Sequence, residues 1–189
     1  MAQTLDRKSE DMLKRISVTG PESTGKSWLA EHLSAHFEEP WVPEYARVFL
    51  ENLNAPYTFD DVLHIAKGQF EAENDLAKTA KEFLFCDTDF LVTHIWCLVK
   101  FGKSHTWIEE MLETHRYTHY LLCSPDLPWQ ADPLREHPNL RKELFEMYKT
   151  ELQNRNFSFS IVSGEGDERL QHAIDAILSF DKVNLSPDL

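Results

Sequence analysis

The stretch GPESTGKS, residues 20–27, constrains what this chain can fold into more than any other feature. An apolar run at 16–19 precedes it and predicts a strand, and the segment 26–37 that follows has the spacing of a helix. The matches to the spacing G-x-x-x-x-G-K-[ST] are Gly20, Gly25, Lys26 and Ser27. Glycines let successive backbone N–H groups turn inward, and the helix directs its positive end at the same hollow. The stretch therefore predicts a binding loop for polyphosphate.

The side chains of this loop predict the cofactors ATP and Mg²⁺. Lys26 is suited to contact the β- and γ-phosphates, and the Ser27 hydroxyl is suited to take one coordination site of Mg²⁺. The residues expected to contact the nucleotide are Gly20, Glu22, Ser23, Thr24, Gly25, Lys26 and Ser27. The structural alternative is a glycine turn that does no more than cap a helix.

Predicted helices and strands alternate along the rest of the chain. After the first strand, short apolar runs predict strands at 41–42, 83–86, 120–123 and 159–162. Helical spacing is found at 26–37, from Thr58 to about Leu76 as one helix or two, and at 90–101, 105–115, 139–154 and 167–180. This order predicts an α/β fold of the P-loop NTPase and nucleotide-kinase type, a doubly wound parallel five-stranded sheet with helices on both faces.

The chain is expected to form one domain with two short ends. Its 189 residues suffice for a single domain with a substantial core, predicted at 15–181. Residues 1–14 are predicted to be an N-terminal arm, and residues 182–189 a loose C-terminal tail. The segment 125–139, PDLPWQADPLREHPN, is too broken by proline for regular structure and predicts a long loop that serves as a lid.

Composition narrows the classes of partner. Acidic residues number 32 against 19 Lys and Arg, and the formal charge of -13 opposes binding to nucleic acid or to an anionic membrane. No run approaches the ~18 apolar residues that span a bilayer, and the N-terminus lacks the apolar core of a signal peptide. Three cysteines without C-x-x-C spacing predict a reduced, cytoplasmic protein. The sequence does not set the oligomeric state.

Two aspartates follow the apolar strand 83–86, at the edge where parallel sheets bind their ligands. Asp87 has the position of a carboxylate that holds Mg²⁺, directly or through water. Asp89 lies one pleat further and is expected to face the same way, so we assign it to the acceptor hydroxyl, although either carboxylate can accept the proton. The alternative for Asp89 is an N-cap of the helix that begins at Phe90.

Polar residues also follow the second strand. Glu44 is suited to bind sugar hydroxyls or to act as the base, Tyr45 offers a stacking face, and Arg47 offers a phosphate or carboxylate contact. The alternative is a surface pair between glutamate and arginine, which contributes little to stability.

The predicted lid carries further candidates. Arg135 is suited to stabilise charge on a transferred phosphoryl group when the loop closes over ATP. Trp129 and Asp132 are placed to face the acceptor. Together with the carboxylates, these residues predict a site for phosphoryl transfer.

Four segments together resemble the nicotinamide riboside kinase domain of NadR-type proteins, from Arg15 to about Phe180. They are GPESTGKS, PEYAR, FLFCDTDF and PDLPWQADPLRE. The resemblance implies a kinase that uses ATP and Mg²⁺ to phosphorylate the 5′-hydroxyl of nicotinamide riboside, a small nucleoside-like substrate, giving the mononucleotide. It also implies roles for Lys26 and Ser27 toward ATP and Mg²⁺, for Glu44, Asp87 and Asp89 toward substrate and metal, and for Arg135 in the lid.

Two other functions stay open at this point. The segment WVPEYAR also looks like the glutamate segment of deoxynucleoside kinases, but those enzymes place Glu/Asp-Arg-Ser after the third strand, where this chain has Asp-Thr-Asp. A regulatory P-loop ATPase that phosphorylates no metabolite is the other alternative. An AAA-type motor would follow its strand aspartate with glutamate, and Thr88 stands there.

Overall fold

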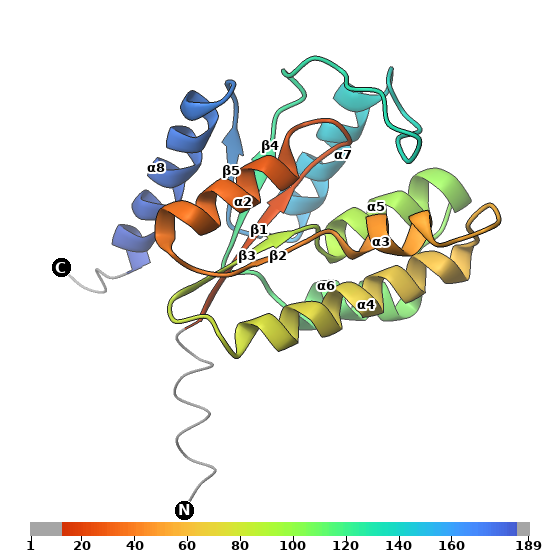
Figure 1. Ribbon diagram of the computed structural model, residues 1–189, viewed down its shortest axis with the longest axis horizontal. Coiled ribbons are helices and arrows are strands. Elements are labelled where there is room, and N and C mark those ends of the chain that lie inside the picture. The colour runs from red at the N-terminus through yellow and green to blue at the C-terminus, as the bar shows by residue number, and fades with distance from the viewer. Residues whose placement is uncertain (1–12, 185–189) are drawn as a thin grey trace, which may run out of the picture.

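Five short segments form a parallel sheet in the computed structural model, which describes residues 13–184 (Figure 1). The strands are β1 (Lys14–Thr19), β2 (Trp41–Val42), β3 (Phe83–Asp87), β4 (His119–Cys123) and β5 (Phe159–Val162). Their order across the sheet is β2-β3-β1-β4-β5, and every neighbouring pair is parallel. All residues of β3 and β4 are buried, which explains why both strands consist almost entirely of apolar residues.

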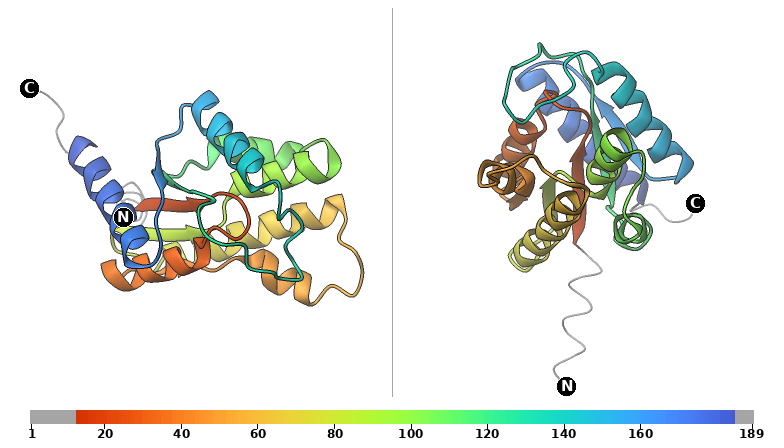
Figure 2. Two further views of the ribbon diagram at one scale, coloured as in Figure 1. Left: turned by 90° about the horizontal axis from the view of Figure 1, so that it is seen from above. Right: turned by 90° about the vertical axis from the view of Figure 1, so that its right-hand side faces the viewer.

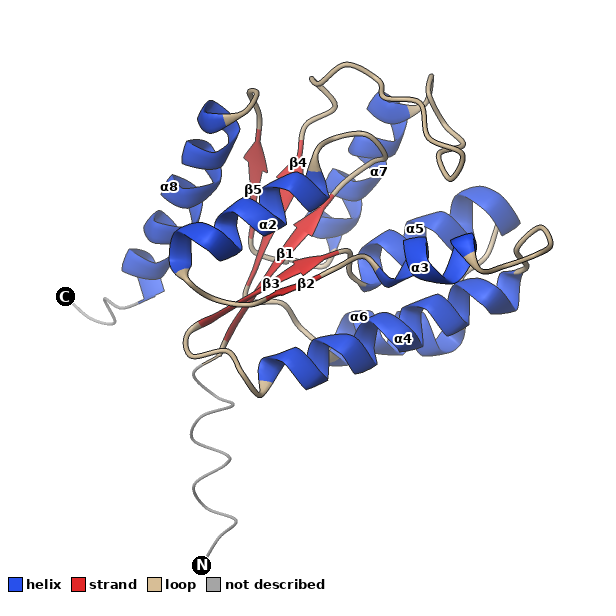
Figure 3. Ribbon diagram, viewed as in Figure 1, coloured by secondary structure: helices blue, strands red, loops and turns tan. Residues whose placement is uncertain are grey.

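Helices cover both faces of this sheet (Figure 3). They are α2 (Lys26–Phe37), α3 (Tyr45–Glu51), α4 (Phe59–Ala77), α5 (Phe90–Phe101), α6 (Thr106–Thr114), α7 (Arg141–Asn154) and α8 (Asp167–Asn184). Within β3, Leu84 and Cys86 join the core shared with α4, α5, α6 and α7. The alternate residues Phe83 and Phe85 join the core shared with α2 and α8. The prediction of a doubly wound parallel sheet is therefore confirmed.

Register brings the loops that follow the strands to one edge of the sheet. Val18 of β1 lies beside Asp87 of β3, and Val42 of β2 lies beside Cys86. The strand order reverses at β1, because the chain first builds the β2 and β3 side and only then adds β4 and β5. Such a switch point opens a crevice beyond the carboxyl ends of the strands. The long loop from β4 to α7 arches over the β1–α2 loop at this edge (Figure 2).

Three element predictions differ from the structure. Residues 58–77 form a single helix, α4, and Thr58 and Asp61 make the capping box at its start. The helix α3 was not predicted, because seven residues between Glu44 and Asn52 carry too little periodic pattern to be recognised. The helix α8 runs to Asn184, past the predicted start of the tail at 182, since no glycine or proline interrupts it before Pro187. The arm at 1–12 and the tail at 185–189 lie outside the described residues.

Two expectations from composition can be compared with the fold. The cysteines Cys86, Cys97 and Cys123 are free and buried. Among residues 13–184, no helix is both long enough and apolar enough to cross a membrane.

The capping box of α4 should contribute measurably to stability. In it, the Thr58 side chain accepts from the Asp61 N–H at 3.3 Å, and the Asp61 carboxylate accepts from the Thr58 N–H at 2.7 Å. We expect Thr58→Ala to lower the free energy of unfolding by about 1 kcal/mol, because an N–H in the first turn loses its acceptor. Urea unfolding measures this change. The exposed helical residue Thr150 provides the control, and an equal loss in Thr150→Ala would contradict the capping role.

Candidate functional site

The phosphate-binding loop is held against the sheet by close backbone contact. Gly20 has φ 130°, and a Cβ atom placed there would lie 3.0 Å from the carbonyl oxygen of Cys123. Gly25 has φ 76° immediately before α2, a conformation that side chains other than glycine rarely adopt. The Lys26 ammonium donates to the carbonyl of Pro21 at 2.8 Å, so the lysine curls over its own loop. The loop therefore has the curled geometry that its glycine spacing predicted.

A cavity of about 660 Å³ opens beyond the carboxyl ends of the strands. One half is lined by the phosphate-binding loop, residues 20–28, together with Leu127, Pro128 and Gln130. The other half is lined by aromatic and aliphatic side chains, among them Tyr57, Trp96, Val99 and Tyr148. Glu44 and Arg47 line the same cavity. A space of this size suits a ligand larger than a lone phosphate.

Asp87 ends β3 beneath the phosphate-binding loop, and its side chain is an unpaired buried acid. The residue is 1% exposed, and neither carboxylate oxygen has a hydrogen-bond partner of normal geometry among the described residues. Burial, and next the nearby Glu44, raise the pKa of Asp87 to about 6, although the Ser27 hydroxyl and Lys26 partly oppose this. Uncompensated buried carboxylates are costly, so this side chain fits a cation that the folded chain does not itself supply.

These residues fit Mg²⁺. No cluster of three or more metal-binding side chains occurs among residues 13–184, and Mg²⁺ needs only one or two carboxylates beside phosphate oxygens and water. Asp87 supplies free carboxylate oxygens, and the Ser27 hydroxyl is exposed to the cavity. Asp87 and Ser27 would hold the ion, which supplies positive charge to the phosphate groups when bound.

Asp89 does not line the cavity, contrary to the expectation that it faces the same way as Asp87. Thr88 between them has φ 90°, which turns the chain out of the strand before a second pleat can form. Asp89 instead lies fully buried, accepts from the Ser17 hydroxyl, and caps α5 by accepting from the Val92 N–H at 2.8 Å. Burial raises its pKa, and the hydrogen bond from Ser17 opposes that rise. The alternative interpretation of Asp89 as an N-cap is confirmed.

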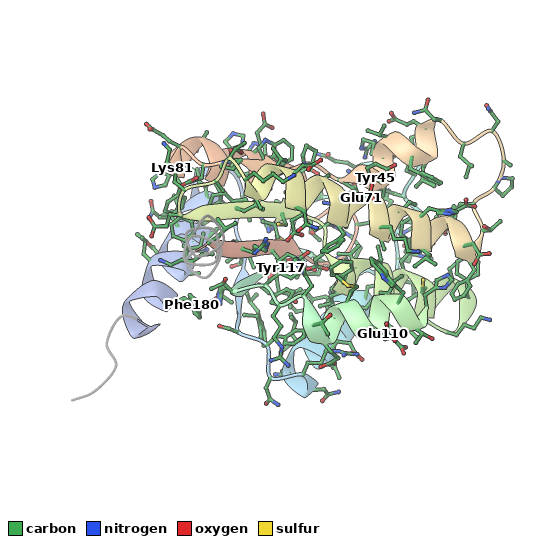
Figure 4. All side chains as sticks on the ribbon, turned by 90° about the horizontal axis from the view of Figure 1, so that it is seen from below. Tyr45, Glu71, Lys81, Glu110, Tyr117 and Phe180 are labelled. Atoms are coloured by element: carbon green, nitrogen blue, oxygen red, sulfur yellow. The ribbon has the colours of Figure 1, made fainter. Side chains whose placement is uncertain are left out.

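Residues 44–47 diverge in direction. Glu44, at the N-cap of α3, lines the cavity. Tyr45 does not line it: its ring lies against α4 (Figure 4), where a Cβ atom on Gly68 would come within 2.3 Å of the ring. The predicted stacking role of Tyr45 therefore has no support in its position. Arg47 lines the cavity and also donates to the Asp132 carboxylate at 3.1 Å, a partner that sequence spacing did not indicate.

The predicted lid, residues 125–139, lies over the phosphate-binding loop. Arg135 lines the cavity and donates to the carbonyl of Gln130 at 2.5 Å. Asp132 is occupied by Arg47 and by the Leu134 N–H at 2.9 Å, so it does not present a free carboxylate to an acceptor. Trp129 does not line the cavity, and the Arg141 guanidinium lies 5.7 Å from its ring centre. Of the three lid candidates, the structure brings only Arg135 to the cavity.

Three aromatic residues of the cavity were not among the predicted site residues. Tyr57 precedes α4, Trp96 lies on α5 and Tyr148 lies on α7, and tertiary folding alone brings them together. The Trp96 indole donates to the Tyr57 hydroxyl at 3.0 Å, and the two rings meet edge to face at 5.1 Å. Their only sequence signal is aromatic character within helical patterns, which is more often a sign of core packing.

Comparison with known proteins places the chain in a family. A family model described as an AAA domain matches residues 15–169, most of the chain. The chain belongs to this family. It is also similar to the "Trifunctional NAD biosynthesis/regulator protein NadR" of Escherichia coli strain K12, with 27% identity over 172 residues that cover 87% of this chain and 42% of that protein. The corresponding protein of Salmonella typhimurium strain LT2 is 28% identical over 127 residues, covering 65% and 31%.

Solved structures agree with this placement. A crystal structure of NadR protein in complex with NR superposes with a TM-score of 0.74 and 26% identity, covering 89% of this chain and 52% of that chain. A deoxyadenosine kinase from M. mycoides, at 12% identity and a TM-score of 0.55, shares the fold alone. The chain spans less than half the length of the curated relatives it matches.

The buried acid at the end of β3 should destabilise the ligand-free protein. Because the folded state raises the pKa of Asp87 to about 6, it holds this proton more tightly than the unfolded chain does, and stability falls as pH rises from about 4 to about 6. We expect Asp87→Asn to raise the free energy of unfolding at pH 7 by about 1–3 kcal/mol, with the gain shrinking toward pH 4.

Thermal unfolding of the nucleotide-free and Mg²⁺-free protein between pH 4 and pH 7 measures this difference. Asp75→Asn is the control, because Asp75 is an exposed residue of an exposed ion pair. A lower stability of Asp87→Asn at pH 7 would show that the carboxylate has a partner that offsets its burial.

Proposed function

We propose that this protein is an ATP-dependent kinase that phosphorylates the 5′-hydroxyl of nicotinamide riboside, giving nicotinamide mononucleotide. The observation that carries the proposal is a single cavity that joins the phosphate-binding loop to an aromatic half, with Glu44 lining it. A site for polyphosphate alone would need no second, apolar half. The similarity to NadR protein, which has been crystallised with NR, supports the choice of acceptor.

Each part of phosphoryl transfer has a residue in this cavity. Lys26 would contact the β- and γ-phosphates, and Ser27 and Asp87 would hold the metal. The acceptor oxygen attacks the γ-phosphorus, the bond to the bridging oxygen of ADP breaks, and the hydroxyl proton leaves. Glu44 is the carboxylate that lines the cavity beside the loop, so we assign the proton to Glu44 in place of Asp89.

The aromatic half also suits a cationic ring. Tyr57 and Trp96 present ring surfaces to the cavity, and the carboxylates of Glu44 and Glu136 line it as well. Aromatic faces and nearby negative charge attract a cation such as the pyridinium ring of nicotinamide riboside. A neutral nucleobase would gain only the stacking, so charge favours the nicotinamide compound over common nucleosides.

Two other functions have some support. A deoxynucleoside kinase is favoured by the shared fold with deoxyadenosine kinase. A regulatory ATPase is favoured by membership in a family described as an AAA domain. The presence of Thr88, and not glutamate, directly after Asp87 counts against an ATPase motor.

A coupled assay of ADP release distinguishes these functions. With ATP and Mg²⁺, we expect release that depends on nicotinamide riboside and not on the common ribo- and deoxyribonucleosides. Lys26→Ala should abolish the turnover and Lys78→Ala, a change at an exposed ion pair, should not. Release stimulated by a deoxynucleoside would support the first alternative, and hydrolysis indifferent to every acceptor would support the second. Normal turnover in Lys26→Ala would refute all three.

The two candidate bases can be separated by matched amide variants. We expect Glu44→Gln to reduce kcat by about 10²-fold or more, the scale of a positioned general base, while ATP still binds. Asp89→Asn should act mainly on stability, because this side chain bonds Ser17 and caps α5 outside the cavity. Steady-state kinetics and thermal unfolding on both variants measure the two effects. Loss of kcat in Asp89→Asn with full stability would return the acceptor role to Asp89.

A further inference from the structure

An acidic residue stands inside the phosphate-binding loop, where its charge would repel a polyphosphate. Glu22 follows Pro21 in that loop and lines the cavity. Its carboxylate accepts from the backbone N–H of Glu136 at 3.1 and 3.2 Å and from the backbone N–H of His137 at 3.0 Å. Both donors belong to the lid, more than a hundred residues along the chain. Glu22 is thus turned toward the lid and held by two N–H groups.

The lid residue at this contact reaches the aromatic half of the cavity through its own side chain. The Glu136 carboxylate accepts from the Tyr57 hydroxyl at 2.9 Å and from the Lys100 ammonium at 2.8 Å. The Tyr57 hydroxyl in turn accepts from the Trp96 indole at 3.0 Å. A continuous chain of hydrogen bonds therefore runs from the phosphate-binding loop, through Glu136, to the wall predicted to hold the acceptor.

Other bonds between loop and lid do not continue to that wall. The Ser23 hydroxyl accepts from the Gln130 N–H at 2.9 Å, and the Ser23 carbonyl accepts from the Arg141 guanidinium at 3.1 Å. Arg141 also donates to the carbonyl of Leu127 at 2.8 Å. These bonds fasten the first part of the lid and the start of α7 to the loop. The path through Glu22 and Glu136 is distinct from them.

We propose that Glu22 and Glu136 are positioning residues that form a latch between the phosphate-binding loop and the acceptor wall, so that nucleotide and acceptor stabilise one lid position together. Glu22 then acts on the lid and does not contact the nucleotide, which revises its predicted role as a nucleotide-binding side chain. The proposal rests on the proposed function for the identity of the acceptor. The latch itself is a property of the ligand-free chain.

Two sites that share one ordered element are thermodynamically coupled. A ligand that holds the lid at one site lowers the cost of ordering it for the other, and the effect is reciprocal. We expect the Kd of nicotinamide riboside to fall by about 5-fold or more when a non-hydrolysable ATP analogue and Mg²⁺ are bound. Loss of the latch should remove most of this factor.

Amide hydrogen exchange tests the latch without any acceptor. In the ligand-free protein, Glu22→Ala should speed exchange in a peptide that covers residues 134–139, because the N–H groups of Glu136 and His137 lose their acceptor. Glu22→Gln keeps a side-chain oxygen for these N–H groups and should exchange like the unaltered protein. Glu31→Ala, a change at an exposed residue of α2, is the control. Unchanged exchange in Glu22→Ala would overturn the proposal, whatever the acceptor proves to be.

Binding titrations test the coupling. The Kd of nicotinamide riboside is measured with and without the ATP analogue in the unaltered protein, Glu22→Ala, Glu22→Gln and Tyr57→Phe. We expect Glu22→Ala and Tyr57→Phe to lose most of the coupling factor, whereas Glu22→Gln keeps it. Tyr57→Phe retains the ring and removes only the hydroxyl that reaches Glu136, so it probes the latch even if Glu22→Ala does not fold.

The outcomes separate the latch from the proposed function. If Glu22→Ala weakens only the ATP analogue and leaves the coupling factor unchanged, Glu22 is a nucleotide contact and the latch is refuted. An absence of coupling in the unaltered protein, with both ligands bound, refutes it as well. If nicotinamide riboside does not bind at all, the proposed function fails, and the exchange measurement alone decides on the latch.

Discussion

The contact between the phosphate-binding loop and β4 is the constraint on which the rest of the site depends. A Cβ atom on Gly20 would lie 3.0 Å from the backbone oxygen of Cys123, so the loop can leave β1 only as glycine backbone pressed against the neighbouring strand. This approach sets the direction of α2 and places Lys26 and Ser27 at the edge of the cavity. The lid then packs on the outer side of the same loop. A side chain at residue 20 would displace all of these together.

The site departs from ordinary folding rules where its chemistry is expected. Asp87 is buried with no hydrogen-bond partner of normal geometry, and Thr88 adopts φ 90°, a conformation that is strained for a β-branched residue. Well-satisfied residues surround this point, among them Asp89 with its bonds to Ser17 and to the Val92 N–H. Burial and the α5 cap thus hold the strained turn in place. The strain keeps Asp87 at the strand end while directing the next carboxylate away from the cavity.

Family membership and cavity shape constrain function in different ways. The match to an AAA domain over residues 15–169 and the similarity to NadR establish the fold and the phosphate-binding edge. Neither describes the acceptor wall of this chain, which is built from α4, α5, α7 and the lid. In this chain, Tyr57, Trp96 and Glu136 form that wall as one hydrogen-bonded group. The wall and the lid therefore cannot be considered separately when substrate choice is studied.

The sequence by itself determined the features that depend on neighbours along the chain. The spacing of Gly20, Gly25 and Lys26 predicts a phosphate-binding loop because backbone freedom and helix start are local properties. Apolar runs predicted the five strands, and the run 83–86 placed Asp87 at a strand end, for the same reason.

Only the tertiary structure decided which side chains meet across the fold. Asp89 turned away because one residue, Thr88, changed the direction of the backbone. Arg47 found Asp132, and Glu22 found the backbone of Glu136, across separations of 85 and 114 residues. Tyr45 packed on Gly68 instead of entering the cavity. Such pairings depend on where loops of irregular conformation come to lie, and no periodic pattern in the sequence encodes that.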